Sequence, residues 1–325
     1  MEKMKIWNGQ EIPALGMGCW AIGGTWDIDA QSNPAGWGQT DDAQSLRALV
    51  VAADHGIQLF DTAQAYGTGH SESLVGQAFG NRDDVVIVTK IGLAIDADKR
   101  QLLGEETDVA RLRASIDGSL ARLQRDQIDL VFLHINELAV DVAEGVFDML
   151  DDVRKAGKIG AYGWSTDFVD RVEPFAGREG FVAVEHAMNV FMPASDMVKC
   201  VEDFGLTGLI RSPLAMGLLS GRYGTDHKFS TDDIRSSNRA GLLYFQDGKV
   251  NPETYQKLES VRDVLQVDGR SLIQGALGWL WSASDRSLPI PGFRSVEQVA
   301  ELCGALEFGP LPDDAMAEIA RVMVE

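Results

Sequence analysis

The stretch GIQLFDTAQAYGTGHSE, residues 56–72, joins a short apolar run to polar residues that follow it closely. A glycine precedes the run and Asp61 ends it, which is typical of a short buried strand. Tyr66 comes five residues later in a turn flanked by glycine. In a barrel of parallel strands, the active site lies at the carboxyl ends of the strands. The stretch therefore predicts a strand that carries Asp61 and Tyr66 to such a site.

Similar apolar runs recur along the 325 residues of the chain. The eight candidate strands are 15–20, 56–60, 84–90, 128–134, 158–165, 181–186, 206–212 and 287–292. Helical periodicity separates most of them, notably over 41–55, 108–124 and 144–156. Strands alternating with helices, without a linker-like break in composition, predict a single-domain α/β fold over residues 1–325. The (β/α)8 TIM barrel fits this pattern better than a doubly wound sheet.

Local signals predict where some elements begin and end. Asp41 and Asp108 are placed to cap the first turns of two of the helices. Gly56 supplies the left-handed residue that ends the helix 41–55. Near the start of the chain, Asn8-Gly9 predicts a tight two-residue turn and hence a short N-terminal β-hairpin.

Two glycine-rich stretches, 21–40 and 220–251, fit neither a helix nor a strand. Long loops in compact domains are commonly lids or binding loops. Trp20, Trp26 and Trp37 lie in or beside the first of them. These tryptophans are expected either to line a substrate pocket or to anchor the loop by packing.

Charge and cysteine content exclude several classes of function. The chain has 49 Asp and Glu against 29 Lys and Arg, a net charge of -20, so its surface repels nucleic acid and acidic membranes. Three widely spaced cysteines, Cys19, Cys200 and Cys303, favour a reducing compartment over a disulfide framework. No run resembles a signal peptide or membrane span, and no cluster has the spacing of zinc ligands. A soluble cytoplasmic protein without a metal is expected.

A polar residue closes one predicted strand after another. The strand ends carry Asp61, Lys90, His134, Ser165, Glu185, Arg211 with Ser212, and Pro291-Gly292. Because branched apolar side chains otherwise fill the inside of a barrel, this pattern indicates an active site at the carboxyl end of the barrel.

Four of these residues suit one reaction. A Lys90 cation would favour the phenolate of Tyr66 and so lower its pKa, and Asp61 would supply the counter-charge that a buried lysine needs. His134 can donate a hydrogen bond to a substrate oxygen on which negative charge develops. Together they predict a proton donor beside a polarised carbonyl group. The electrons must come from a cofactor.

The order and spacing of several blocks resemble the aldo-keto reductase family, from about residue 15 to about residue 306. The blocks are GIQLFDTAQAYGTGHSESLVGQAF at 56–79, VTK at 88–90, LVFLH at 130–134, GWST at 163–166, SPLAMGLLSG at 212–221 and IPGFRSVEQV at 290–299. The resemblance implies a (β/α)8 barrel that binds NADPH without a Rossmann fold and reduces aldehydes or ketones to alcohols. It implies Tyr66 as the general acid, Lys90 and Asp61 as the pair that tunes it, and His134 as the residue that orients the carbonyl.

The resemblance also implies contacts with the cofactor. Ser165 matches the serine that holds the nicotinamide carboxamide, and Thr166 replaces the usual asparagine beside it. Glu185 stands where glutamine is common, so it is protonated, accepts from the carboxamide NH2, or has lost that role. The other implied cofactor residues are Arg211, Ser212, Leu214, Gly217, Leu218, Ser220, Arg222, Gly292, Arg294, Ser295, Gln298 and Glu301. Arg294 and Ser295 match positions that meet the 2'-phosphate of NADPH.

Two other functions remain open at this stage. One is a regulatory nicotinamide-binding subunit with slow turnover, similar to the channel-associated β subunits that resemble this family. The other is a barrel whose Lys90 forms a Schiff base with a carbonyl substrate. The Schiff-base hypothesis is the weaker of the two, because it leaves Tyr66 and Arg294 without a role.

Overall fold

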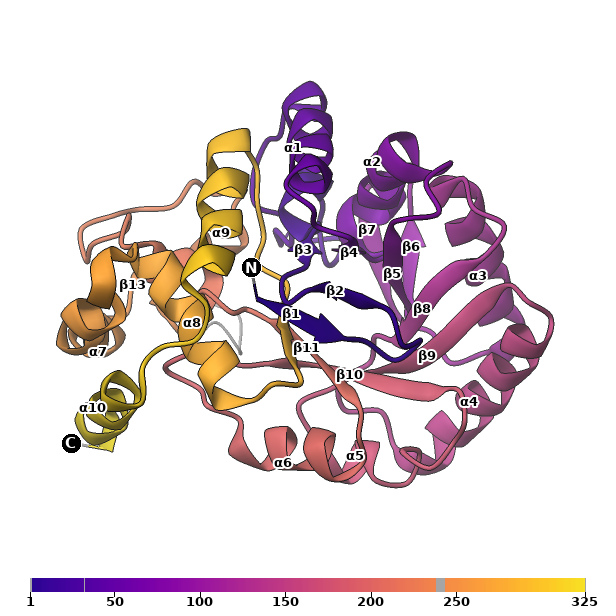
Figure 1. The fold of residues 1–325 in the computed structure, drawn as a ribbon. Helices are drawn as coiled ribbons and strands as arrows, with labels where there is room; N and C mark the ends of the chain where they lie inside the picture. The colour runs from indigo at the N-terminus through magenta and orange to yellow at the C-terminus, as the bar shows by residue number, and fades with distance from the viewer. Residues whose placement is uncertain (1, 32, 238–242, 325) are drawn as a thin grey trace.

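Eight parallel strands form a nearly closed barrel with helices on its outside (Figure 1). The computed structural model describes residues 2–31, 33–237 and 243–324. The strands, in their order around the barrel, are β3 (Met17–Gly18), β4 (Leu59–Asp61), β5 (Val86–Ile91), β8 (Ile128–Leu133), β9 (Ile159–Ser165), β10 (Phe181–Ala187), β11 (Thr207–Arg211) and β14 (Ser287–Pro289). All eight predicted strands and the (β/α)8 fold are confirmed.

The first and last strands meet where glycine lets two main chains approach. The amides of Gly16 and Gly18 donate to the carbonyl oxygens of Pro289 and Pro291 at 2.9 and 3.0 Å. A parallel bridge from Gly18 to Gly292 extends this contact. A Cβ on Gly18 would lie 2.6 Å from the main-chain oxygen of Ile290, the residue that follows β14, so only glycine fits there.

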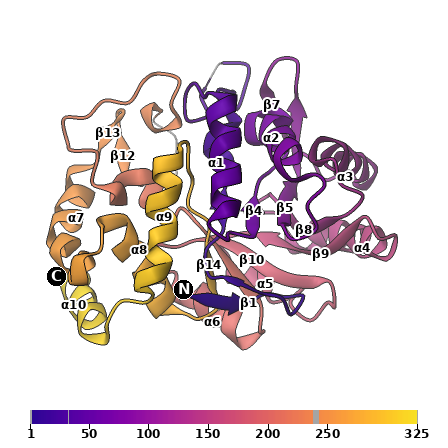
Figure 2. The same ribbon diagram turned by 45° about the horizontal axis from the view of Figure 1, so that its top comes forward.

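Helices lie on the outside of the strands, most of them against the barrel and two of them packed on another helix (Figure 2). They are α1 (Asp42–Asp54), α2 (His70–Phe79), α3 (Val109–Leu123), α4 (Val140–Lys155), α5 (Val169–Val172), α6 (Ser195–Asp203), α7 (Pro252–Leu265), α8 (Leu272–Ala283), α9 (Val296–Phe308) and α10 (Asp313–Val324). Asp41 accepts from the Gln44 amide at 3.0 Å and Asp108 from the Arg111 amide at 2.9 Å, so both predicted N-caps are confirmed. Gly56, with φ of 89°, ends α1 as expected.

Two local predictions differ from the structure. The helix expected over 144–156 is α4 and begins earlier, at Val140, because its buried stripe continues through Ala143 toward the N-terminus. The hairpin formed by β6 (Leu93–Asp96) and β7 (Gln101–Glu105) was not predicted. Neither strand is fully buried, so neither shows the clear apolar alternation that marks a strand in a sequence.

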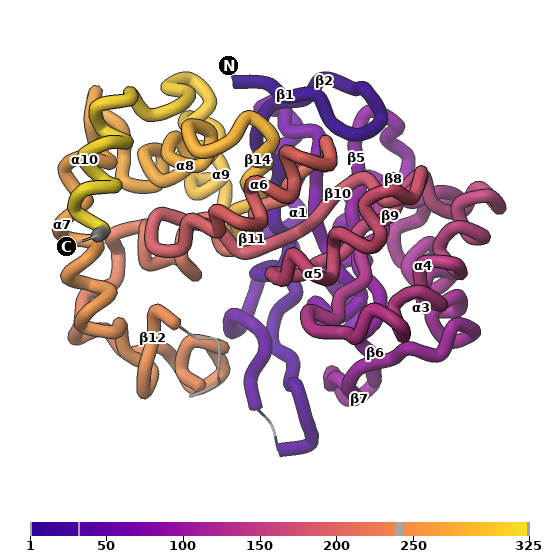
Figure 3. Tube along the Cα trace, turned by 90° about the horizontal axis from the view of Figure 1, so that it is seen from below, coloured from indigo at the N-terminus to yellow at the C-terminus, as the bar shows by residue number. Residues whose placement is uncertain are grey.

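The two ends of the barrel carry different structures. The predicted N-terminal hairpin is present as β1 (Lys3–Lys5) and β2 (Glu11–Pro13). Its turn has three residues rather than two, because the Ile6 amide pairs with the Gln10 carbonyl oxygen at 3.0 Å. Figure 3 shows this hairpin at the opposite end from β6, β7 and β12 (Phe245–Gln246). The end away from the hairpin is the one that holds the carboxyl ends of the strands.

Besides the hairpin β6–β7, the described residues of the loops at that end form only short regular elements. These are η1 (Trp20–Gly23), η2 (Tyr66–Gly69), η3 (Ala215–Ser220), η4 (Ile234–Ser236), β12 and β13 (Lys249–Val250). A bridge between Trp37 and Asp233 joins the loop 21–40 to the loop 220–251. Residues 32 and 238–242 of these loops lie outside the described residues.

Replacing Gly275 in α8 with alanine is expected to destabilise the protein by about 1–3 kcal/mol, the usual effect of overpacking. The added Cβ would lie 1.8 Å from the main-chain oxygen of Leu265 in α7. Gly145→Ala in α4 is the matched control, because nothing lies within 4 Å of its Cβ. The control should stabilise the protein by roughly 0.5–1 kcal/mol through helix propensity. Urea unfolding measures both, and equal free energies of unfolding for the two variants would contradict this account of the α7–α8 contact.

Candidate active site

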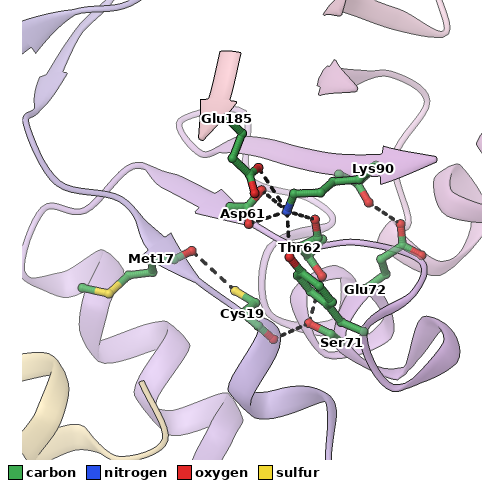
Figure 4. A network of polar contacts seen from close by, with 10 residues as sticks. Met17, Cys19, Asp61, Thr62, Ser71, Glu72, Lys90 and Glu185 are labelled. Carbon is green, nitrogen blue, oxygen red and sulfur yellow. Dashed lines mark hydrogen bonds and ion pairs between the residues drawn. The ribbon is translucent and has the colours of Figure 1, made fainter. Parts of the chain in front are cut away.

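Asp61, Tyr66 and Lys90 meet inside the carboxyl end of the barrel. Lys90 Nζ donates to Asp61 Oδ1 and Oδ2 at 2.7 and 2.6 Å (Figure 4). It also donates to Tyr66 Oη at 3.0 Å. A further hydrogen bond of 3.0 Å goes to the Thr62 carbonyl oxygen. The structure therefore brings together three of the predicted catalytic side chains.

The turn after β4 places Tyr66 in this position. The Thr62 hydroxyl lies 2.8 Å from the Ser71 hydroxyl, which donates to the Cys19 carbonyl oxygen at 2.8 Å. Gly67 has φ of 61°, and a Cβ there would lie 2.1 Å from the Gly23 carbonyl oxygen. The glycine beside Tyr66 thus lets η2 pack against η1 and turns the phenol toward Lys90.

Lys90 has one more acidic partner than the sequence predicted. Its ammonium nitrogen lies 3.3 Å from Glu185 Oε2 on β10. Burial lowers the pKa of Lys90, but the charges of Asp61, Glu185 and Tyr66 outweigh that effect and raise the pKa above its ordinary value. Lys90 is therefore held as an ammonium ion, although its side chain has no exposed surface.

The Lys90 charge lowers the pKa of Tyr66, as predicted, but it does not determine the net shift of that pKa. Burial raises the pKa of Tyr66 above its ordinary value, and the opposing effect of Lys90 does not offset the rise. Asp61 and Glu185 add to the rise because they disfavour a further negative charge nearby. The expectation of a lowered pKa is wrong, and Tyr66 is a neutral phenol that holds its proton at neutral pH.

His134 lies beside Tyr66 at the end of β8. Its amide donates to the Ile91 carbonyl oxygen at 2.7 Å, and its ring meets the Tyr66 ring edge-on with centroids 6.0 Å apart. Burial, with smaller effects from Lys90 and Arg211, lowers the pKa of His134 well below its ordinary value. His134 is therefore a neutral imidazole, with Nδ1 buried and without a hydrogen-bond partner among the described residues.

A cavity of about 560 Å³ opens in front of Tyr66 and His134. Strand ends and both long loops contribute to its wall. The predicted residues that line it are Asp61, Tyr66, His134, Ser165, Glu185, Arg211, Ser212, Leu214, Gly217, Gly292, Arg294, Gln298, Trp20, Trp26 and Trp37. Its volume lies within the range of about 300–1,000 Å³ that is usual for small-molecule and cofactor sites.

The other predicted site residues lie outside the lining of this cavity. Lys90 lies behind the wall, and Thr166 is buried, with its hydroxyl donating to the Asn136 carbonyl oxygen at 2.6 Å. The Ser295 hydroxyl accepts from the Gln298 amide and caps α9. The remaining residues are Leu218, Ser220, Arg222 and Glu301. Cofactor contacts from these positions stay predictions.

The three tryptophans both line the cavity and hold the first loop. The Trp20 ring stacks on the Tyr66 ring, with centroids 5.9 Å apart and 18° between the planes. Its Nε1 donates to the Ala35 carbonyl oxygen at 3.0 Å, and Trp37 meets it edge-on at 5.2 Å. Trp26 packs in the same small cluster as Tyr66. The wall next to the phenol is therefore apolar and aromatic.

Two arginines at the cavity have different partners. Arg294 Nη1 donates to the Trp37 carbonyl oxygen at 2.9 Å, and Nη2 donates to that of Gln39. No carboxylate in the described part of the chain pairs with Arg294, so its charge is not neutralised. Arg211 instead forms an ion pair with Asp167.

Several residues that line the cavity were missed in the sequence, and Arg235 and Asn136 are two of them. Arg235 is paired with Asp233 through two nitrogens and lies 4.0 Å from the centre of the Phe229 ring and 4.8 Å from that of Trp37. These contacts between loops leave no pattern that a sequence reveals. Asn136 also lines the cavity, and its place two residues after His134 was a usable signal.

The sequence matches the model of the Aldo/keto reductase family over residues 14–323. The chain belongs to this family. The aldo-keto reductase YhdN of Bacillus subtilis is 30% identical over 309 residues, which cover 91% of this chain and 87% of that protein. The aldo-keto reductase yakc [NADP(+)] of Schizosaccharomyces pombe is 27% identical, with coverage of 97% and 89%.

Solved structures of aldo-keto reductases share the architecture. The glycerol dehydrogenase AKR11B4 of Gluconobacter oxydans superposes with a TM-score of 0.81 at 25% identity, covering 99% of this chain and 95% of that one. The barrel predicted from the strand pattern is thus also the barrel of the family. No helix within residues 2–31, 33–237 and 243–324 has the length and apolarity needed to cross a membrane.

Proposed function

We propose that this aldo-keto reductase uses NADPH to reduce aldehydes or ketones to alcohols. The observation that carries the proposal is the 3.0 Å contact between Tyr66 Oη and Lys90 Nζ at the wall of the cavity. A neutral phenol beside a fixed ammonium ion can give up a proton while its resulting negative charge is stabilised. The yakc relative carries NADP(+) in its name, which supports the choice of NADP(H) as the cofactor.

The residues around the cavity suit the phosphate groups of a dinucleotide cofactor. The loop after β11 passes through positive φ at Ser212, Ala215 and Met216, with values of 54°, 48° and 54°. Such a backbone can turn successive amides toward an anion. Arg294 adds a positive charge without a carboxylate partner, which suits a 2'-phosphate. Ser165 and Glu185 line the cavity near Tyr66 and would hold the nicotinamide end, where NADPH supplies the hydride.

The side chains of the chain then have separate tasks. Tyr66 transfers its proton to the carbonyl oxygen as that oxygen gains negative charge. Neutral His134 donates a hydrogen bond to the same oxygen and so orients the carbonyl. Lys90 stabilises the phenolate that remains, and Asp61 holds the Lys90 ammonium in place through two hydrogen bonds.

Oxidation of NADPH in the presence of a panel of aldehydes and ketones tests the proposal. Turnover that depends on the carbonyl compound is the expected result. Tight NADPH binding with negligible turnover would favour the regulatory subunit instead. A Schiff base on Lys90, detectable by borohydride trapping, is not expected, because it needs a neutral amine and the pKa of Lys90 is raised.

Arg294→Ala is expected to weaken NADPH binding roughly 10–100-fold, the value of a hydrogen bond to a charged group. NADH binding should change much less, because NADH lacks the 2'-phosphate. Fluorescence titration with each cofactor measures the two dissociation constants, and Arg82→Ala, which removes an exposed partner of Asp84, is the control. Arg294 also holds the loop at Trp37 and Gln39. An equal loss of affinity for both cofactors would show that Arg294 acts by holding this loop, and would contradict the phosphate contact.

A further inference from the structure

The Lys90 ammonium faces two buried carboxyl groups. Asp61 lies 2.6 Å from Nζ and Glu185 lies 3.3 Å from it, and the two side chains are 2% and 1% exposed. Glu185 Oε2 is buried and accepts no hydrogen bond within the described residues. If both carboxyl groups were ionised, the cluster would carry one uncompensated negative charge away from solvent, which is costly.

Other charged groups near the pair do not remove this excess. The titratable groups around it are Cys19 after β3, Tyr66 after β4, Lys90 in β5, His134 after β8 and Arg211 at the end of β11. His134 is neutral, and Arg211 is paired with Asp167. Among the residues that the structure describes, Lys90 is the only cation that forms an ion pair with either carboxyl group.

Two carboxyl groups that share one site ionise one after the other rather than together. Burial raises the pKa of Asp61 well above its ordinary value, the charge of Glu185 raises it further, and Lys90 only partly opposes the rise. The surroundings therefore favour a state in which one of the two groups keeps its proton. The proton is therefore assigned to the pair and not to either carboxyl group alone.

We propose that Asp61 and Glu185 hold one proton between them at neutral pH, and that this proton passes through Lys90 to Tyr66 after each reduction. The proposal rests on the proposed function, in which Tyr66 is the proton donor. Glu185 is then a positioning residue and proton reservoir that acts through Lys90. A glutamine at this position could not fill that role, because an amide does not release a proton.

The transfer balances without any change of oxidation state. The O–H bond of Tyr66 breaks as the O–H bond of the alcohol forms, which leaves a phenolate. An N–H bond of Lys90 then breaks and the O–H bond of Tyr66 is restored across 3.0 Å. The O–H bond of the shared carboxyl proton breaks and the ammonium of Lys90 is restored. Solvent returns a proton to the pair through the cavity, which both carboxyl groups line.

Infrared titration of the protein without ligands tests the shared proton directly. At pH 7 the wild-type protein should show the C=O stretch of a protonated carboxyl group, and the band should fade as the pH rises. Glu185→Gln should abolish the band, because one carboxylate then balances one ammonium. Asp129→Asn is the control, since burial raises the pKa of Asp129 outside the cluster and its removal should leave this band in place. Absence of the band from the wild type at pH 7, or its persistence in Glu185→Gln, would overturn the proposal.

The pH profile of turnover tests the return of the proton. Glu185→Gln should lower kcat about tenfold at pH 7, equivalent to about 1.4 kcal/mol, with the KM for the carbonyl substrate little changed. As the pH rises and the shared proton is lost, kcat of the wild type should fall toward that of the variant. Parallel pH profiles for the two proteins would show that Glu185 only shapes the site and would refute the relay.

The two readouts keep this proposal separate from the proposed function. If no carbonyl compound is reduced by the wild type, the proposed function fails, and the infrared result still decides whether the pair holds a proton. If the wild type is active and the band is missing, the proposed function stands and the reservoir is refuted. Circular dichroism and a thermal melt verify that Glu185→Gln is folded, and the wild-type infrared titration remains decisive if it is not.

Discussion

Tyr66→Phe is expected to lower kcat for carbonyl reduction by about 10²–10⁴-fold, the range for loss of a positioned proton donor. Phenylalanine keeps the ring that stacks on Trp20 at 5.9 Å and removes only the hydroxyl that contacts Lys90 at 3.0 Å. The cavity wall should therefore persist, and NADPH affinity should change little. Steady-state NADPH oxidation measures kcat, and quenching of tryptophan fluorescence on titration with NADPH measures binding.

Tyr162→Phe is the matched control for this experiment. Its hydroxyl lies on β9 and donates to Asp151 at 2.6 Å, and the residue does not line the cavity. Loss of this hydrogen bond to a carboxylate should reduce stability by about 1.5–3 kcal/mol and leave kcat near the wild-type value. Turnover of Tyr66→Phe close to that of Tyr162→Phe would show that another group protonates the substrate.

The fold was predictable because its strands are short, apolar and regularly spaced. A strand such as β5 is buried along its whole length, and the polar Lys90 near its end pairs with Asp61 of the neighbouring strand. The hairpin β6–β7 was not predictable, because it is only partly buried and its pairing depends on a turn outside the barrel. The three-residue turn after Ile6 shows the same limit, since Asn-Gly predicts a hairpin but does not fix the register in which its two strands pair.

The candidate site was predictable in its residues and less so in its electrostatics. Asp61, Lys90 and His134 lie at the carboxyl ends of three neighbouring barrel strands, so their proximity follows from topology. The net pKa shift of Tyr66 depends on how deeply the phenol is buried, and a sequence does not give that depth. Likewise, the contact of Glu185 with Lys90 requires β10 to face β5 across the inside of the barrel.

Lys90→Met is expected to destabilise the protein by about 3–5 kcal/mol at neutral pH, the usual effect of leaving buried charge unpaired. Methionine has nearly the same length but cannot neutralise Asp61 and Glu185, whose carboxyl groups remain buried. Lys158→Met is the control, because Lys158 pairs with Asp117 where both side chains are about half exposed. A surface pair of this kind contributes at most about 1 kcal/mol. Urea unfolding of each variant gives the free energy of unfolding.

The loss in Lys90→Met should depend on pH in a defined direction. The pKa of Asp61 is already raised by burial and by Glu185, and removal of Lys90 raises it further. A carboxyl group with a raised folded-state pKa stabilises the fold below its unfolded pKa of about 4, and this stabilisation is lost as the pH rises through the folded-state pKa. In the wild type the pKa of Lys90 is raised, so its contribution stays constant over the same acidic to neutral range. The difference in unfolding free energy between the two proteins should therefore widen from pH 5 to pH 8, and a difference that stays constant would mean that Lys90 does not neutralise the carboxyl pair.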